Sequence, residues 1–204
     1  MDSNAIADKA AIRELVEDWV IYRDAGDWER FREVWHADGW MSATWLQASA
    51  AEFIETSRRL FDQGVQILHQ LGGWTCDVVG HRAISQVKMT INQRASVDGV
   101  LVDVVCIGRF YDFLEKREGR WGIVRRQPIY EKDRLDPIDP TAILRLDADI
   151  LARFPEGYRH LAYLQLKNGF DVKNDLPGTR GPAVERVYAE GKAWLEGSAS
   201  AWGA

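Results

Sequence analysis

The feature that most constrains the fold is the dipeptide Asp98–Gly99, which separates two long strand-like segments. Residues 83–97 alternate between apolar and polar side chains, and residues 101–115 begin with side chains that are apolar on both faces, as in a central strand. Because Asp-Gly favours the tight turn of a hairpin, these two segments are predicted to pair as antiparallel strands. Further strands are predicted at residues 40–45, at 66–79 with a break at Gly72–Gly73, and at 120–130.

Helices are predicted ahead of these strands. Apolar side chains recur every three or four residues from Ile12 to Tyr22, which is the spacing of one helical face, and Gly26 can end this first helix. Shorter helices are predicted at residues 27–35 and 49–62. Helices followed by a run of long antiparallel strands indicate an α+β fold, with three N-terminal helices on the concave face of a curved sheet.

The sequence changes character after residue 134. Five prolines divide residues 135–204 into short helical pieces, predicted at 141–153, 157–168 and 182–196. These pieces are too polar and too interrupted for a core of their own. We therefore expect one domain at residues 1–134 and a helical C-terminal extension at 135–204 that wraps this domain or a neighbouring subunit. The uncovered face of the sheet also predicts a homo-oligomer, as a dimer or trimer.

The amino-acid composition excludes some classes of binding partner. The net charge of -5 argues against nucleic acid or an anionic membrane as the main partner. No apolar run approaches the roughly 20 residues of a membrane span, and residues 1–5 lack the features of a signal peptide, so we expect a cytoplasmic protein. Cys76 and Cys106 both fall in strand-like segments and are expected to be buried thiols.

Asp24, His69 and Arg126 are the candidate catalytic residues. Asp24 lies near the end of the first predicted helix, where the helix dipole disfavours a carboxylate that has no specific partner. His69 lies in a predicted strand, and Arg126 follows in the last one. A carboxylate that orients an imidazole, beside a fixed cation, can remove a proton and stabilise the anion that forms.

Each of these residues also has a simpler structural explanation. Asp24 could cap a helix, and a lone histidine in a strand is often a satisfied core residue. Arg126 competes with Arg125, because neighbours in a strand point to opposite faces and only one of the two can enter a pocket. We prefer Arg126 for that place.

Six further residues could line a substrate pocket. For each aromatic residue among them, packing in the core is an equally good explanation, and for the arginine a charge pair on the surface is an equally good one. These residues are Tyr22, Trp40, Trp45, Phe61, Arg109 and Tyr111. His36, His81 and His160 have no metal-binding spacing, and the sequence has no glycine-rich phosphate loop. We therefore expect no metal and no cofactor.

The chain resembles the SnoaL-like branch of the nuclear transport factor 2-like superfamily. The resemblance rests on Asp-Lys-Ala-Ala-Ile-Arg-Glu-Leu at residues 8–15 and Tyr-Arg-Asp-Ala-Gly-Asp-Trp at 22–28, and it covers roughly residues 5–132. Within the branch it is similar to scytalone dehydratase and hexachlorocyclohexane dehydrochlorinase. Catalytic residues of both enzymes fall on Asp24 and His69, and in the dehydrochlorinase a catalytic arginine falls on Arg126 and a pocket tryptophan on Trp40. The resemblance implies a cone-shaped α+β barrel.

This resemblance implies a cofactor-independent lyase that acts on a hydrophobic aromatic or cyclic small molecule. Water is the expected leaving group, but relatives also eliminate halide, and some that act on lignin-derived aromatics release formaldehyde. One position departs from the family, because Trp19 stands where relatives often have Lys or Tyr, and Trp cannot act as a general acid. The alternatives are an isomerase or cyclase that uses the same base, and a non-catalytic small-molecule-binding or assembly module.

Overall fold

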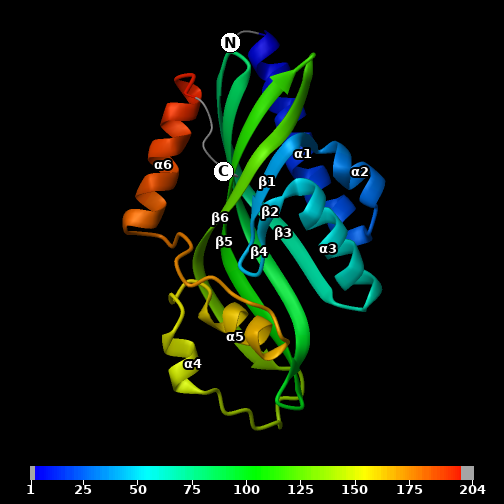
Figure 1. The fold of residues 1–204 in the computed structure, drawn as a ribbon, viewed down its shortest axis with the longest axis vertical. Coiled ribbons are helices and arrows are strands. Elements are labelled where there is room, and N and C mark those ends of the chain that lie inside the picture. Colours follow the sequence, from blue (N-terminus) through cyan, green and yellow to red (C-terminus); the bar gives the residue numbers. More distant parts are fainter. Residues whose placement is uncertain (1–2, 199–204) are drawn as a thin grey trace.

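The computed structural model describes residues 3–198, in which helices both precede and follow one large sheet (Figure 1). The N-terminal helices are α1 (Ser3–Ala25), α2 (Trp28–Glu33) and α3 (Ala50–Asp62). The strands are β1 (Trp35–Ser42), β2 (Gln47–Ser49), β3 (Gln66–Val79), β4 (Arg82–Val97), β5 (Val100–Arg117) and β6 (Arg120–Pro137). The C-terminal helices are α4 (Ala148–Ala152), α5 (Arg159–Lys167) and α6 (Pro182–Leu195).

The six strands form one mixed sheet in the order β2-β1-β6-β5-β4-β3. Strands β1 and β6 run parallel, and each of the other neighbouring pairs is antiparallel. The sheet is open, with β2 and β3 at its edges. The predicted α+β fold with a curved, largely antiparallel sheet is therefore confirmed.

The predicted hairpin at Asp98–Gly99 is confirmed. Both turn residues have positive φ angles, 49° for Asp98 and 83° for Gly99, and Val97 pairs with Val100. Two successive left-handed residues make the turn whose twist matches that of antiparallel strands, and Asp and Gly tolerate this conformation best. The pairing of β3 with β4 is irregular between Leu71 and Trp74, where the sequence predicted a break.

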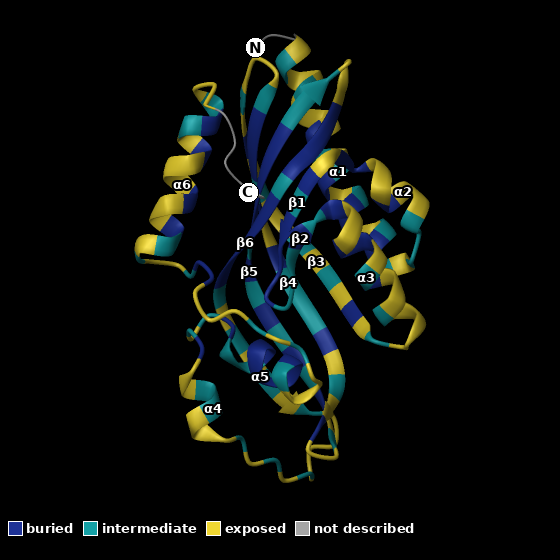
Figure 2. Ribbon diagram, in the orientation of Figure 1, coloured by how far each residue is buried: buried dark blue, intermediate teal, exposed yellow. Residues whose placement is uncertain are grey.

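Helices cover both faces of the sheet. Helices α1, α3 and α5 share a buried cluster with one face, to which Trp19, Phe53 and Leu161 contribute. Helix α6 packs on the opposite face, where its Trp194 joins a second cluster with Phe113. Figure 2 shows the buried residues concentrated along β5 and β6, between these two layers. The C-terminal helices thus complete both layers around the central strands.

Several predicted boundaries were wrong. The helix predicted at 141–153 forms only at Ala148–Ala152, because the Asp147 side chain accepts hydrogen bonds from the backbone of Asp149 and Ile150 and so starts the helix late. The helix predicted at 27–35 ends at Glu33, since Trp35 already begins β1. Strand β2 was not predicted, and β6 continues past Tyr130 to Pro137 because β5 offers partners along that whole length.

Both cysteines are free and buried, as the sequence predicted. Burial raises the pKa of the Cys76 thiol to about 12 and that of Cys106 well above its ordinary value. Both therefore carry protonated thiols at neutral pH. Among the helices at residues 3–198, none is long and apolar enough to cross a membrane.

Candidate active site

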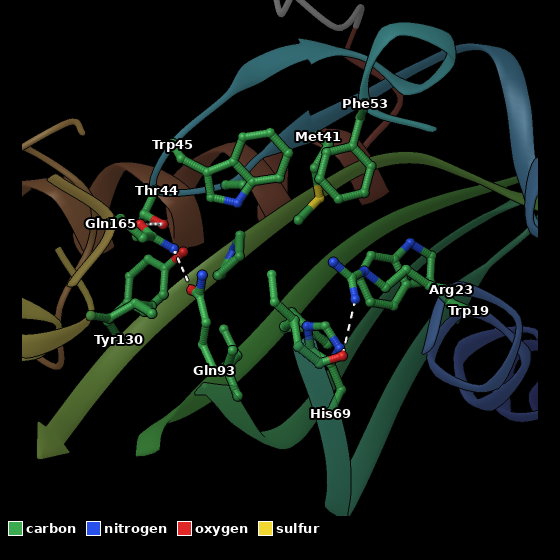
Figure 3. Close-up of a pocket in the computed structure, with 16 residues that line it drawn as sticks. Trp19, Arg23, Met41, Thr44, Trp45, Phe53, His69, Gln93, Tyr130 and Gln165 are labelled. Carbon is green, nitrogen blue, oxygen red and sulfur yellow. Dashed lines mark hydrogen bonds between the residues drawn. The ribbon is translucent and has the colours of Figure 1, made fainter. Parts of the chain in front are cut away.

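A small cavity lies between the sheet, helices α1 and α3 on one side, and helix α5 on the other (Figure 3). Most of its lining is apolar, and its ionisable lining residues are Arg23, His69 and Tyr130. The space open to a water-sized molecule is about 40 Å³. A water molecule needs about 10–15 Å³ by this measure, so the cavity has room for only a few waters. A larger ligand therefore requires the lining side chains to move.

The predicted contact between Asp24 and His69 is present. Asp24 Oδ1 lies 2.8 Å from His69 Nδ1, and Asp24 Oδ2 accepts a hydrogen bond from the backbone nitrogen of His69 at 2.5 Å. The contact forms because the end of α1 packs against β3. With both carboxylate oxygens bound to one residue, the imidazole is fixed in position and in ring orientation.

These contacts assign the protons of His69. A carboxylate can only accept hydrogen bonds, so Nδ1 carries the ring proton and Nε2 keeps a lone pair. Burial lowers the pKa of His69 below 6.5; Asp24 opposes this shift, while the charges of Arg23 and Arg126 add to it. At neutral pH the cavity therefore contains a neutral imidazole with a free Nε2, which is the form that acts as a base.

Arg23 is a site residue that the sequence analysis missed. Its Nη1 donates to the backbone oxygen of Ile67 at 3.1 Å and to Asp24 Oδ1 at 3.3 Å. A usable signal was its spacing from Trp19, because residues four apart on a helix lie on the same face and both side chains line the cavity. Burial lowers the pKa of Arg23, although Asp24 opposes this effect. The guanidinium places positive charge beside the Asp24–His69 pair.

Arg126 points to the inner side of the sheet but does not line the cavity. It is fully buried and makes two bonds to Asp112, of 2.7 and 2.8 Å. Its guanidinium lies 4.3 Å from the Trp19 ring centroid and 4.1 Å from that of Phe110. Arg126 therefore contacts two residues of the cavity wall and does not itself line the cavity.

Trp19 is the position at which the sequence analysis found a departure from the family pattern. Its ring meets the His69 ring edge to face, with centroids 5.3 Å apart. The Trp19 side chain is buried, and its Nε1 has no hydrogen-bond partner among residues 3–198. Trp19 thus supports the imidazole by packing.

Three of the predicted pocket residues on strands lie outside the cavity. Arg109 and Tyr111 are on the face covered by α6, where Arg109 forms an ion pair with Glu131 at 3.0 Å. Trp40 pairs with Arg125 on β6, so it shares the register position of the outward-facing arginine. Met41, one residue later, pairs with Arg126 and lines the cavity where Trp40 was expected.

Of the predicted pocket residues on the helical side, Trp45 lines the cavity and two others do not. The Tyr22 ring lies against Arg30, with the guanidinium 4.7 Å from the ring centroid. Phe61 is 42% exposed and packs against Trp28. Helical spacing placed both on apolar stripes, but these two side chains lie against α2.

Four polar residues of the cavity were also missed by the sequence analysis. They are Thr44, Gln93, Tyr130 and Gln165. Strand alternation gave a signal for Gln93, because it follows Met89 and Ile91 on an otherwise apolar face. No comparable signal existed for Gln165, since the docking position of α5 depends on long-range packing.

Metal ligands do not cluster in the part of the chain that the structure describes, where no three His, Cys, Asp or Glu side chains are grouped to hold an ion. His36 and Asp38, which are close in sequence, have protein partners instead. His36 Nε2 donates to the backbone oxygen of Glu115, and Asp38 accepts two bonds from Arg117.

Solved structures with similar folds include two whose names refer to elimination reactions. A putative scytalone dehydratase from Novosphingobium aromaticivorans aligns with a TM-score of 0.56 at 16% identity, covering 71% of this chain and 100% of that chain. A type 2 hexachlorocyclohexane dehydrochlorinase (LinA) aligns with a TM-score of 0.57 at 14% identity, covering 71% and 98%. At such low identities the alignments show a shared fold.

Sequence relatives cover nearly the whole chain. Pea pathogenicity protein 2 of Fusarium vanettenii is 36% identical over an alignment of 207 residues, and the alignment covers 96% of this chain and 88% of that protein. An uncharacterized protein of Emericella nidulans is 37% identical over 210 residues, with coverage of 95% and 88%. The SnoaL-like domain family matches residues 4–127, which run from α1 into the first half of β6. The chain therefore belongs to the SnoaL-like family, within the nuclear transport factor 2-like superfamily.

Proposed function

We propose that this protein is a cofactor-independent lyase that takes a proton from a hydrophobic aromatic or cyclic small molecule and eliminates water. The observation that carries the proposal is the two-point contact of Asp24 with His69 at the wall of an apolar cavity. A buried, oriented and neutral imidazole is suited to act as a general base. The fold similarity to a dehydratase and a dehydrochlorinase supports elimination as the reaction.

In the proposed reaction, His69 Nε2 takes a proton from a ring carbon of the substrate. The C–H electron pair becomes the new double bond, and the hydroxyl group on the neighbouring carbon leaves with the electrons of its C–O bond. Trp19 cannot protonate this leaving group, so the imidazolium of His69 returns the proton and water departs. Asp24 stabilises the imidazolium while it exists.

The role of Arg126 differs from the one that the sequence resemblance implied. Its buried pairing with Asp112 and its stacking on Trp19 and Phe110 support a positioning role. Its charge also disfavours protonation of His69. Arg23, which lines the cavity, is the cation closer to the substrate in this proposal.

An isomerase or cyclase is the second candidate. The observation in its favour is that residue 19, which lines the cavity, is Trp. The family resemblance leads us to expect Lys or Tyr there, and either of these could protonate a leaving group, whereas Trp cannot. Isomerisation needs a base that removes a proton and returns it elsewhere, and His69 can do both. Loss of halide or formaldehyde in place of water would use the same base.

The C-terminal extension is part of the same proposal. We assign residues 1–134 to the family domain and residues 135–204 to an extension that completes the site. Leu161 and Gln165 on α5 support this assignment, because both line the cavity.

A screen of hydroxylated aromatic and alicyclic compounds tests the proposed function. Compounds are ranked by thermal shift and then incubated with enzyme while new conjugation is followed by ultraviolet absorbance. Elimination lowers the product mass by the mass of water, whereas isomerisation leaves it unchanged, so mass spectrometry separates the two candidates. The lyase proposal fails if only highly charged compounds, such as sugar phosphates, stabilise the protein.

A further inference from the structure

The end of the cavity away from His69 contains a chain of buried hydrogen bonds. Thr44 Oγ1 donates to Gln165 Oε1 at 2.6 Å, and Gln165 Nε2 donates to Gln93 Oε1 at 3.1 Å. All three side chains line the cavity, and each residue is at most 3% exposed. Figure 3 shows this group on one side of the cavity and His69 with Arg23 on the other. The cavity therefore has one basic end and one polar, uncharged end.

In the structure, the Gln93 amide takes its orientation from Gln165. Because the oxygen of Gln165 accepts from Thr44, its nitrogen faces Gln93, and the oxygen of Gln93 is used in turn. The Gln93 Nε2 group is left over at the cavity wall, and the hydrogen bonds described for residues 3–198 include none that it donates. An amide donor that faces a cavity without a protein partner is suited to a ligand that brings an acceptor.

The sheet register sets the spacing between the two residues that carry this donor and the base. His69 on β3 pairs with Ile91 on β4, and Gln93 lies two residues further along the same face of β4. Such diagonal neighbours have Cα atoms about 7–8 Å apart. A single six-membered ring with one oxygen substituent can extend across this separation.

We infer that Gln93, oriented by Gln165 and Thr44, recognises a carbonyl or other acceptor oxygen at the end of the ligand opposite to the proton that His69 removes. The ligand class is an apolar ring compound that carries one such oxygen. This inference rests on the proposed function only in taking His69 as the base. Gln93 is a specificity residue that contacts the ligand, and Gln165 is a positioning residue supplied by the C-terminal extension.

Binding of acetophenone and α-methylstyrene tests the inference. The two molecules have the same shape, and the second has a CH₂ group in place of the carbonyl oxygen, so both require the same opening of the cavity. Dissociation constants are measured by ligand-observed NMR titration of the full chain. The wild type is expected to bind acetophenone about tenfold more tightly, which is the effect of one additional hydrogen bond in a cavity.

The Gln93→Leu variant is expected to lose this preference while it still binds α-methylstyrene. Gln127→Leu is the matched control, because Gln127 is also a buried glutamine on a neighbouring part of the sheet but bonds to Pro128 and Arg125 and does not line the cavity. This control should keep the wild-type preference. Equal affinities in the wild type, or no detectable binding of acetophenone at millimolar concentration, would overturn the inference.

The Gln165→Glu variant tests the positioning role. Once its buried carboxyl group is ionised at alkaline pH, this residue can only accept, so the Gln93 amide turns its nitrogen towards residue 165 and its oxygen towards the ligand. The preference for acetophenone is then lost, and aniline, which donates, binds more tightly than toluene. A merely structural role would not produce this exchange. Retention of the acetophenone preference in this variant, or an aniline preference in the wild type, contradicts the assigned orientation.

The inference and the proposed function fail separately. Oxygen-dependent binding that persists in the His69→Gln variant supports the Gln93 site whether or not turnover is found. Turnover that depends on His69 without any oxygen preference in binding would leave the lyase proposal standing and remove the Gln93 site.

Discussion

Asp24 holds His69 at two points, through the ring Nδ1 at 2.8 Å and the backbone nitrogen at 2.5 Å. The same contact joins Asp133 to His160, with both bonds at 2.7 Å. The surroundings differ, because His69 lines the cavity whereas Asp133 also accepts from the backbone of Leu161 and anchors the start of α5. The two-point contact therefore indicates a catalytic base only where the histidine lines a cavity. The Asp133–His160 pair has the same contact without this property, so it can be compared with the Asp24–His69 pair in the same protein.

Replacement of His69 by Gln is expected to reduce turnover by at least about 100-fold, because a positioned general base contributes factors of this size or larger. Circular dichroism should remain that of the wild type. The control is His160→Gln, which leaves the backbone bonds to Asp133 in place and should keep turnover near the wild-type value. Equal losses in the two variants would show that the effect is structural.

Asp24→Asn should reduce turnover on the order of 10³–10⁴-fold, by the logic of a carboxylate that sets an imidazole tautomer. The asparagine amide would donate to Nδ1, so the ring proton would move to Nε2 and the base would lose its lone pair. Nitrogen NMR of the imidazole reports this tautomer directly, alongside the rate. An unchanged tautomer together with an unchanged rate would remove Asp24 from the mechanism.

The Asp24–His69 contact could be predicted from sequence because it depends on a helix end and one strand, and because the family resemblance marks both positions. The environment of Arg126 could not be predicted. Arg117 pairs with Arg120 at the turn, and an uninterrupted ladder from there would place Tyr111 opposite Arg126. An irregularity between Phe113 and Leu114 shifts the register by one residue and puts Asp112 there instead. Nothing in the local sequence specifies such a bulge.

The aromatic residues of the cavity could also be predicted only in part from the sequence. Periodicity identified the apolar positions of Tyr22 and Phe61, but it could not distinguish the cavity from the surface near α2. The polar end of the cavity depends on Gln165, whose position follows from the anchoring of α5 by Asp133. That contact joins residues 27 positions apart, and no local pattern specifies it.

The protein is expected to form a homo-oligomer. Ile143 is 84% exposed, and Leu101 and Ile138 are 49% and 41% exposed near the end of the β5–β6 ladder. Burying such side chains between subunits is favourable. Light scattering at micromolar concentration should give a mass that is a multiple of 23.2 kDa. A mass of one chain at that concentration would rule the prediction out.

Asp112→Ala is expected to lower the free energy of unfolding by about 3–5 kcal/mol, because it leaves the charge of Arg126 buried without its partner. Both side chains of this pair are fully buried. The control is Asp103→Ala on the same strand, since the Arg94–Asp103 pair is 45% and 34% exposed and its loss should change stability little. Urea denaturation measures the free energy of unfolding of both variants. Similar decreases in the two variants would contradict the statement that burial makes the Arg126–Asp112 pair important for stability.

The pH dependence of turnover follows from the environment of His69. Burial lowers the pKa of this residue below its ordinary value of 6.5, so the imidazole of the free enzyme stays neutral until the pH falls below that value. The catalytic efficiency kcat/KM should therefore be constant at neutral and alkaline pH and should decrease on the acid side, with a midpoint below pH 6.5, as Nε2 takes up a proton. Arg126 adds to the lowering of this pKa, so the Arg126→Met variant should move the decrease to higher pH if it remains folded. A profile whose acid limb lies above pH 6.5 in the wild type would mean that His69 is charged at rest, and a charged imidazole cannot accept the substrate proton.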